Sequence, residues 1–442
     1  MSISHNVGGL NDYLARIRTS RGYFNFKRCL ENCLSKIPTV GIPLAKTLKL
    51  FKDSIRRFFI KDTFFEDLGL VYLGPADGHD INKLTQVLTE AKSKHRCCVV
   101  HMITKKGRGY TFAEREPDKY HAVGSFDASV GAAASTGGTF SAHMGDTLCA
   151  LAAEDERICA ITAAMRDGTG LTRFCAEYPD RFFDVGIAEE HAITFAGGLA
   201  AAGMLPAVAL YSTFSQRVYD QVLHDVSIQK LPLLLLLDRC GIVAGDGITH
   251  QGIFDYPMFS SIPDVSIYSP ERFSELSAVM KYALGKRQLA IVRYPKGGED
   301  CTYDMRFHMS RDGYISYSDG IFDCEAIIIT YGRTASEACR AVKILDGEKR
   351  VGIIKLIRIY PIDVVSIIPL ISNAKLLYVF EEGIRSGGVG EKLAALLANG
   401  RHRVFIRAIN GYLPHGSTDR LRSECGLTAE CAVQDIVSLM DK

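Results

Sequence analysis

Short, continuously apolar segments recur along most of this chain and are separated by stretches of helix length. Examples are Ile158–Thr162, Leu233–Leu237 and Ala326–Thr330. Strands that are apolar on both faces are typical of parallel sheets that helices cover on both sides. The alternation of such strands with helical segments indicates α/β units. The sequence therefore predicts an α/β fold with mostly parallel sheets.

The alternation is interrupted twice, so we expect three consecutive α/β units. The first contains a strand, a helix and a strand over residues 70–103. A basic amphipathic segment at Ile42–Lys61 precedes them, and we interpret it as a solvated helix over a core in preference to a membrane- or RNA-binding segment. A polar, Gly-rich linker and a later polar connector separate the units. The predicted boundaries are 1–123 for the first unit, 124–139 for the linker, 140–300 for the second unit, 301–324 for the connector, and 325–442 for the third unit, which we interpret as a scaffold or assembly domain.

The composition favours a cytoplasmic globular protein without a nucleic-acid or membrane partner. The formal net charge is +2, which argues against broad electrostatic binding of nucleic acid or acidic lipid. The 13 cysteines form no Cys-x-x-Cys motif, and Cys97, Cys98 and Cys240 lie in apolar runs that suggest buried thiols in a reducing compartment. The first residues lack the pattern of a signal peptide, and no apolar run is long enough to span a bilayer.

Polar side chains follow four of the predicted strands at the points where these strands end. In open parallel sheets, ligands bind at the carboxyl ends of the strands. We therefore expect the four polar segments to converge on one site. They are Met165-Arg-Asp-Gly168, Gly186-Ile-Ala-Glu189, Tyr211-Ser-Thr-Phe214 and Asp238-Arg-Cys-Gly241.

The segment Asp184–His191 joins a predicted strand to an Ala- and Gly-rich helix. Glu189 and Glu190 lie in the first turn of that helix, where the helix dipole favours carboxylates. Judged by itself, either glutamate is more often only a helix-start residue. The motifs around this segment decide between that interpretation and a catalytic role.

Six motifs together carry a resemblance to a known family. They are Gly74–Asp80 (GPADGHD), Lys105–Tyr110 (KKGRGY), Tyr120–Val123 (YHAV), Gly186–Ala192 (GIAEEHA), Tyr211–Gln221 (YSTFSQRVYDQ) and Asp238–Gly252 (DRCGIVAGDGITHQG). With these motifs the chain resembles, almost from end to end, the 1-deoxy-D-xylulose-5-phosphate synthases, which are thiamine-diphosphate enzymes of the transketolase superfamily. The resemblance implies a transketolase-like fold with three parts: a remnant of the diphosphate-binding domain, a pyrimidine-binding domain and a C-terminal domain.

The resemblance also implies a reaction and its cofactors. Pyruvate would condense with D-glyceraldehyde 3-phosphate, with loss of CO₂, to give 1-deoxy-D-xylulose 5-phosphate, a precursor of isoprenoids, thiamine and pyridoxal. The implied cofactors are thiamine diphosphate and Mg²⁺. Glu189 matches the carboxylate that faces the pyrimidine ring of the cofactor, and Glu190 is expected to be only a helix-start residue. His121 and His250 match histidines near the reacting carbonyls, where imidazoles suit proton transfer near neutral pH.

The resemblance assigns further residues to cofactor and substrate. Arg239 matches a phosphate anchor, whose guanidinium can hold two oxygens at once. At the family's second phosphate arginine this chain has Lys296, which lacks the planar fork, so we expect looser phosphate binding with Arg293 as a weaker helper. The other matching positions are Tyr211, Arg217 and Asp246 for substrate and Tyr110 and Phe214, with Glu189, for cofactor.

The metal motif of these enzymes does not match. Thiamine-diphosphate enzymes hold Mg²⁺ with oxygen ligands from Gly-Asp-Gly and from an Asn about thirty residues later. The only Gly-Asp-Gly here is Gly245–Gly247, and the chain has no Asn between Asn82 and Asn373. We therefore expect the side-chain metal ligands to be absent and the family's N-terminal segment to precede Met1, whose backbone carbonyl matches a metal contact.

Three explanations of that gap stay open. The chain is a fragment of a complete enzyme, or a separate polypeptide supplies the upstream half, or the chain is a non-catalytic pseudoenzyme or binding module. Retention of Glu189, His121, Arg239 and His250 argues for recent catalytic ancestry. A β-type subunit of a 2-oxoacid dehydrogenase and a split transketolase are the alternative enzymes. We expect a homodimer, because the superfamily shares its cofactor cleft between two copies, and no catalysis by the chain alone.

Overall fold

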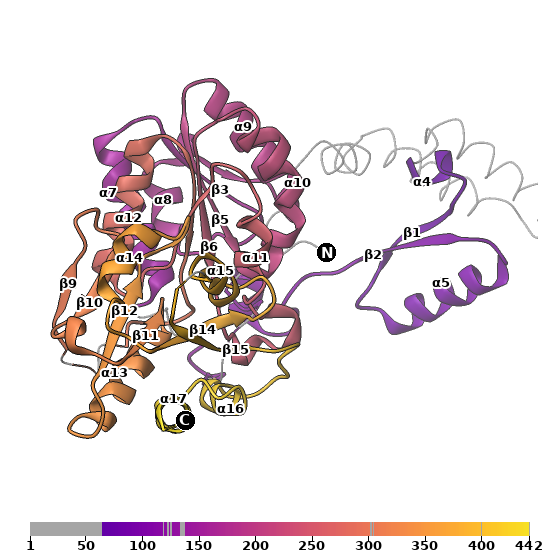
Figure 1. Ribbon diagram of the computed structural model, residues 1–442. Helices are drawn as coiled ribbons and strands as arrows, with labels where there is room; N and C mark the ends of the chain where they lie inside the picture. The colour runs from indigo at the N-terminus through magenta and orange to yellow at the C-terminus, as the bar shows by residue number, and fades with distance from the viewer. Residues whose placement is uncertain are drawn as a thin grey trace, which may run out of the picture. The chain divides into compact units, whose positions relative to one another are not determined.

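The computed structural model describes residues 64–117, 119–121, 123, 126–132, 138–300, 303, 305–398 and 400–441 (Figure 1). The segment Ile42–Lys61 and Met1 lie outside the described residues. The chain divides into two compact units, essentially Ile3–Ala133 and Ala134–Lys442, and each is described by itself. In the described parts of the chain, no helix combines the length and apolar character needed to cross a membrane.

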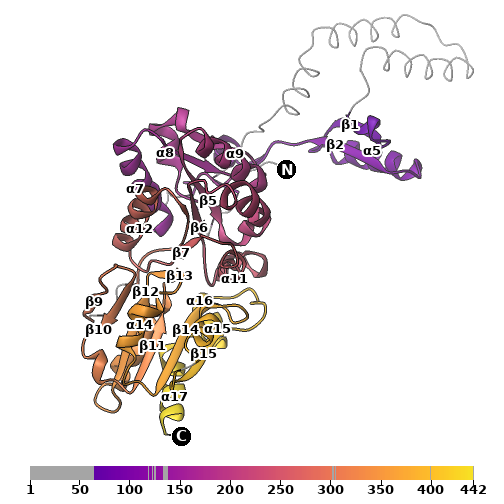
Figure 2. The same ribbon diagram turned by 45° about the horizontal axis from the view of Figure 1, so that its top comes forward.

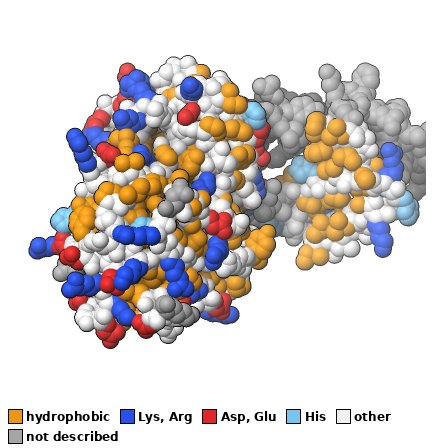
Figure 3. Space-filling view, in the orientation of Figure 1, with side chains coloured by type: hydrophobic (Ala, Val, Ile, Leu, Met, Phe, Trp, Pro, Cys, Tyr) orange, Lys and Arg blue, Asp and Glu red, His pale blue; other side chains and the backbone are white. Residues whose placement is uncertain are grey.

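The first unit contains the predicted strand, helix and strand. Strands β1 and β2 pair in parallel, and the backbone N–H of Lys83 donates to Oδ1 of the N-cap residue Asp80 (3.0 Å). The helix between them has no buried residue, and its apolar side chains Ile81 and Leu88 are exposed. Figure 3 shows hydrophobic side chains on the surface of this unit. The elements are α4 Phe64–Asp67, β1 Val71–Asp77, α5 Ile81–Ser93, β2 Cys98–Ile103 and α6 Thr111–Arg115.

A seven-stranded sheet forms the centre of the second unit. Its order is β13-β7-β8-β6-β5-β3-β4. Every pairing is parallel except that of β13 with β7. The strands are β3 Ile158–Thr162, β4 Phe182–Asp184, β5 Leu205–Tyr211, β6 Leu233–Asp238, β7 Ser266–Tyr268, β8 Leu289–Arg293 and β13 Arg358–Tyr360.

Helices cover both faces of this sheet (Figure 2). Along β6, Leu233, Leu235 and Leu237 pack into one core cluster with α9, while Leu234 and Leu236 pack into another with α7 and α12. Because successive strand residues point to opposite faces, a strand covered on both sides is apolar at every position. The helices are α7 Phe140–Glu154, α8 Thr172–Glu177, α9 Glu189–Ala201, α10 Tyr219–Gln221, α11 Asp255–Phe259 and α12 Phe273–Lys286, with shorter helical turns η1 Pro179–Arg181, η2 Ser212–Val218, η3 Val222–Ser227, η4 Ala244–Asp246 and η5 Ile248–His250.

A six-stranded sheet follows, in the order β15-β14-β11-β12-β10-β9. Its strands are β9 Phe307–Met309, β10 Ile315–Ser318, β11 Ala326–Thr330, β12 Val351–Leu356, β14 Leu376–Ile384 and β15 Arg403–Ile409. Its helices are α13 Thr334–Leu345, α14 Val364–Leu370, α15 Val389–Leu396, α16 Thr418–Glu424 and α17 Ala429–Met440, with the turn η6 Ile321–Asp323. The α/β class with mostly parallel sheets is confirmed.

The two sheets of the second unit are more closely connected than the sequence suggested. Strands β9 and β10 lie inside the predicted polar connector 301–324 and pair antiparallel with each other, and β10 also pairs with β12. Strand β13 follows β12 but pairs with β7 of the other sheet. The chain therefore returns to the seven-stranded sheet before it completes the six-stranded one.

Candidate active site

The polar segments that follow β3, β5 and β6 contact one another, as predicted, and the Glu189–Arg217 ion pair links the segment after β4 to the chain that follows β5. The tyrosine hydroxyl of Tyr211 lies against Gly168, since a Cβ added to that glycine would be 1.8 Å from it. The Arg239 guanidinium lies over the Tyr211 ring, 3.8 Å from the ring centroid. These contacts bring segments from three strands to one edge of the seven-stranded sheet. They form where the carboxyl ends of its parallel strands meet.

Glu189 and Glu190 have different environments at the start of α9. Glu189 is buried and Glu190 is exposed. The turn before the helix is fixed by Asp184, whose Oδ1 accepts from the backbone N–H of Ala164 (2.8 Å) and of Gly186 (3.0 Å). The first turn of a helix stabilises a buried carboxylate because its free N–H groups carry partial positive charge.

The buried Glu189 carboxylate is paired with Arg217. Nη1 of Arg217 donates to Oε1 of Glu189 at 2.9 Å. The Arg217 side chain is 42% exposed and that of Glu189 is 3% exposed, so the pair is open on the arginine side. Among the described residues Oε2 of Glu189 accepts no hydrogen bond, which leaves this oxygen for a donor on a ligand.

Arg239, Asp246 and Lys296 form a second charged group, which we name the cation pair site. Nη1 of Arg239 lies 2.5 Å from Oδ2 of Asp246, and Nζ of Lys296 lies 2.8 Å from Oδ1. Arg239 has a left-handed backbone with φ 63°. Burial acts to raise the pKa of Asp246, but Lys296 and Arg239 outweigh it and hold the pKa below its usual value. The site has two cations and one carboxylate, so it favours a further anion.

Phe214 connects the two charged groups through ring contacts. Its ring stacks on Tyr211, with 5.9 Å between the ring centroids, and meets the ring of His250 edge-on at 5.5 Å. The Arg217 guanidinium lies 5.1 Å from the Phe214 ring centroid. Burial raises the pKa of Tyr211 to about 12, so its hydroxyl stays protonated. The result is an apolar wall beside His250 and beside Arg217, the ion-pair partner of Glu189.

The loop that carries Asp246 and His250 is closed at its base by backbone hydrogen bonds. Gly241 and Gly252 exchange N–H to carbonyl bonds of 2.7 and 2.9 Å. Within the loop, the backbone N–H of Val243 donates to Oε1 of Gln251 at 2.8 Å. The side chain of Thr249 contacts Nδ1 of His250 at 2.9 Å. The loop therefore has a fixed base and presents His250 toward Phe214.

Tyr110 and His121 belong to the first unit, and the structure does not join them to the groups above. The Tyr110 hydroxyl donates to the carbonyl of Ala128 (2.8 Å), and its ring packs against Phe112 and Tyr120. His121 is exposed. The metal contact expected at Met1 lies outside the described residues. The roles predicted for these three residues stay predictions.

Arg293 is not available to assist Lys296, contrary to the expectation from its neighbouring position. Its Nε donates to Oδ2 of Asp255 at 2.8 Å, and its Nη2 to Oδ1 at 3.2 Å. The two side chains are 4% and 1% exposed. A buried bidentate pair of this kind leaves neither partner free, because separating it would leave an uncompensated charge.

Sequence reasoning gave no individual role to two buried acids, one beside Arg239 and one in the six-stranded sheet. Asp238 ends β6 directly before Arg239 and is fully buried, and burial raises its pKa to about 7. Glu381 lies in β14, where it accepts from the backbone N–H groups of Val389 and Gly390 (3.0 Å each). Burial also raises the pKa of Glu381 to about 7. The sequence signal for both acids was their position at the end of a continuously apolar run.

Three family descriptions match this chain. "Transketolase, pyrimidine binding domain" matches residues 138–298, "1-deoxy-D-xylulose-5-phosphate synthase" matches residues 1–104, and "Transketolase, C-terminal domain" matches residues 323–431. The matches cover β1 and β2 of the first unit, all strands of the seven-stranded sheet, and β11, β12, β14 and β15 of the six-stranded sheet.

Curated relatives give the same family, and solved structures share the fold. The 1-deoxy-D-xylulose-5-phosphate synthase of Clostridium kluyveri is 41% identical over 447 residues, covering 100% of this chain and 71% of that protein. The synthase of Clostridium tetani is 37% identical, covering 100% and 72%. A split gene transketolase, described as an inactive β4 tetramer, is similar with TM-score 0.60 and 22% identity, covering 68% of this chain and 98% of the other. Transketolase from Campylobacter jejuni is similar with TM-score 0.58 and 13% identity, covering 86% and 70%.

Proposed function

The chain belongs to the 1-deoxy-D-xylulose-5-phosphate synthase family, and from that premise we propose that it condenses pyruvate with D-glyceraldehyde 3-phosphate, with loss of CO₂. The product is 1-deoxy-D-xylulose 5-phosphate. The observation that carries the proposal is the buried Glu189 carboxylate, which has one oxygen paired with Arg217 and the other open. The cation pair site lies beside the same sheet edge and suits a phosphorylated substrate.

The Glu189 environment fits thiamine diphosphate. When bound, this cofactor supplies an electron sink at its thiazolium ring, which the amino acid side chains of a protein cannot provide. Glu189 would hold a proton at its open oxygen toward the pyrimidine ring, and Arg217 would keep the carboxylate oriented. The stacked rings of Tyr211 and Phe214 would exclude water from one side. Exclusion of water strengthens the electrostatic contacts inside such a site.

The described residues do not fit Mg²⁺. No group of three or more His, Cys, Asp or Glu side chains converges for a metal in the portion of the chain that the structure describes. Asp246 is the acid of the only Gly-Asp-Gly triplet, and its two carboxylate oxygens pair with Arg239 and Lys296. These residues therefore support no catalytic step that uses the metal. We propose that the side-chain ligands of Mg²⁺ come from residues that are not among those described.

The cation pair site would bind the phosphate of glyceraldehyde 3-phosphate. Arg239 can offer two parallel N–H donors to phosphate oxygens, and Lys296 adds a point charge. His250 lies next to Phe214 and would give or take a proton at the sugar carbonyl. His121 is proposed for the same kind of step from the first unit. The homodimer expected from the resemblance also stays a prediction.

A product assay tests the proposal. The purified chain is supplied with pyruvate, glyceraldehyde 3-phosphate, thiamine diphosphate and Mg²⁺, alone and together with the part of the C. kluyveri synthase that this chain does not cover. We expect 1-deoxy-D-xylulose 5-phosphate from the combined preparation. Glu189→Gln is expected to lower the rate by at least about 100-fold, because it removes a proton-transferring carboxylate, whereas Glu190→Gln is the matched control and should retain the rate.

The identity of the product separates the proposal from its rivals. Transfer of an acyl group to a lipoyl carrier, or exchange of two-carbon units between sugars, would favour a 2-oxoacid dehydrogenase subunit or a transketolase instead. Absence of any product from the combined preparation, with both proteins shown to be folded, would contradict the synthase assignment and favour a binding module.

A further inference from the structure

The turn that carries Lys296 is held by Arg333, which lies between β11 and α13. Nη2 of Arg333 donates to the backbone carbonyl of Lys296 at 2.6 Å and to that of Gly298 at 3.3 Å. Arg333 directly precedes α13, at its N-cap position. Between the two carbonyls, Gly297 has φ +93°, and a Cβ added to it would lie 3.6 Å from the same nitrogen. Arg333 thus holds the turn at two residues, Lys296 and Gly298, on either side of Gly297.

The Lys296 side chain needs such support. Its ion pair with Asp246 is 46% exposed on the lysine side, and exposed ion pairs contribute little to orientation because water competes for both charges. A lysine side chain also has several rotatable bonds whose freedom is lost on ordering. The position of its ammonium group is therefore set largely by where the backbone of the turn is held.

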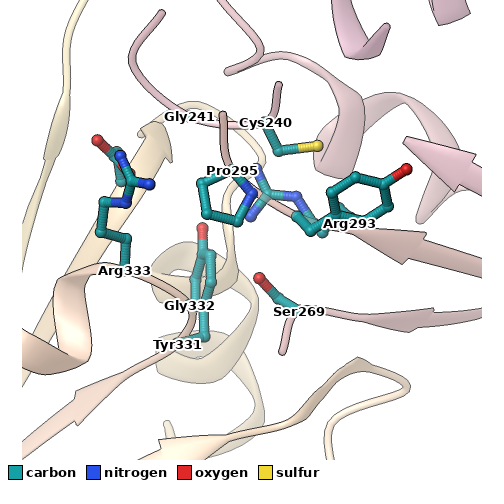
Figure 4. Close-up of a pocket in the computed structure, with 10 residues that line it drawn as sticks. Cys240, Gly241, Ser269, Arg293, Pro295, Tyr331, Gly332 and Arg333 are labelled. Atoms are coloured by element: carbon teal, nitrogen blue, oxygen red, sulfur yellow. The ribbon is translucent and has the colours of Figure 1, made fainter. Parts of the chain in front are cut away.

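The hydrogen bonds of the Arg333 guanidinium go to backbone carbonyls of this turn, while Glu382 and Asp300 act on its charge from a greater distance. Burial lowers its pKa, and among the described residues no carboxylate lies within ion-pair distance of it. It borders a cavity of about 20 Å³ whose other walls include Gly241 and Pro295 (Figure 4). Figure 4 shows the Arg333 side chain beside Pro295, the residue before Lys296. Arg333 therefore borders the same cavity as Gly241, which lies two residues after Arg239, and Pro295, which directly precedes Lys296.

We propose that Arg333 is a positioning residue that fixes Lys296 so that Arg239 and Lys296 hold one phosphate group together. The inference rests on the proposed function of the cation pair site. It gives the C-terminal domain a part in substrate binding, in addition to the scaffold role expected from sequence.

Binding of inorganic phosphate to the full 442-residue chain, measured by calorimetric titration, tests the inference without catalysis. We expect Arg333→Met to weaken phosphate binding about five- to tenfold, as loss of one charge-assisted hydrogen bond would. Lys296→Met should weaken it by a similar factor. The double variant should bind no more weakly than Lys296→Met alone, because residues that act through one another are not additive. Arg333→Lys should recover part of the affinity.

Arg181→Met is the matched control. Arg181 likewise donates to backbone carbonyls, those of Ala152, Asp155 and Ile158, away from the cation pair site. Its loss should lower the melting temperature but leave phosphate affinity unchanged. If Arg333→Met does not fold, Arg333→Lys carries the test with an expected two- to threefold loss.

Three results would overturn the inference. They are unchanged phosphate affinity in both Arg333 variants, a loss in Arg333→Met that adds fully to that of Lys296→Met, and no phosphate binding by the wild-type chain. None of these decides the product assay, so failure of this inference is distinguishable from failure of the proposed synthase reaction.

Discussion

At the scale of single residues, Asp238 shows how burial changes an acid beside the site. It is the last residue of β6 and its side chain is fully buried. Burial raises its pKa from the usual 3.8 to about 7. The folded chain therefore keeps a proton that the unfolded chain releases between about pH 4 and 7. Over this window the contribution of Asp238 lowers stability as the pH rises.

Asp238→Asn is therefore expected to flatten the dependence of stability on pH. Asparagine has no charge to bury, so the variant should gain on the order of 1–3 kcal/mol relative to wild type on going from pH 4.5 to pH 8. The measurement is urea unfolding at several pH values. Glu381, whose pKa is also raised by burial to about 7, should leave a residual slope of the same sign. A variant with the full wild-type slope would contradict the assignment.

At the scale of elements, the loop between Arg239 and Gly252 depends on a close contact with β14. Gly241 has φ +80°, and a Cβ added to it would lie 2.6 Å from Oε2 of Glu382. Glu382 is itself held near Arg422, with 3.6 Å between Oε1 and Nε. The base of the loop therefore has no room for a side chain.

Gly241→Ala is expected to lower the free energy of unfolding by about 1–3 kcal/mol, because alanine is strained at positive φ and its methyl group must displace the carboxylate. Gly245→Ala, in the same loop, is the control, since an added Cβ there meets nothing within 4 Å. Thermal and urea unfolding of both variants give the comparison. Equal stability of the two variants would show that Glu382 moves aside at little cost.

At the scale of the whole second unit, a buried ionic cluster joins the two sheets. Nζ of Lys355, in β12, lies 2.9 Å from Oε2 of Glu271 and 2.6 Å from Oε1 of Glu275. These side chains are 5%, 3% and 14% exposed, respectively. The cluster and the crossing strand β13 both resist separation of the six-stranded sheet from the seven-stranded one.

Lys355→Met is expected to cost about 3–5 kcal/mol of unfolding free energy, because it leaves two carboxylates buried without their cation. Lys375→Met is the matched control: its pair with Glu325 is exposed at 79% and 55%, so its loss should cost less than about 1 kcal/mol. Denaturant unfolding measures both. A small loss for Lys355→Met would mean that water reaches the cluster when the lysine is removed.

The sequence by itself determined the fold class and the chain segments of the site. Burial of backbone polar groups forces regular strands and helices, and sheets covered on both sides force continuous apolar runs such as Leu233–Leu237. These patterns are local in the chain and can be read without coordinates. The same patterns predicted that Glu189 lies in the first turn of α9 and that the carboxyl ends of the strands meet at one edge of the sheet. The domain boundaries and the roles of the site residues stay predictions.

Only the tertiary structure decided which side chains are partners. Asp246 pairs with Lys296, and Arg293 pairs with Asp255. Arg333 donates to the backbone carbonyl of Lys296. Strand β13 joins the sheet that its neighbours in sequence do not. The strength of an ion pair or hydrogen bond depends on distance and burial in space, and residues far apart in the chain carry no periodic signal of either.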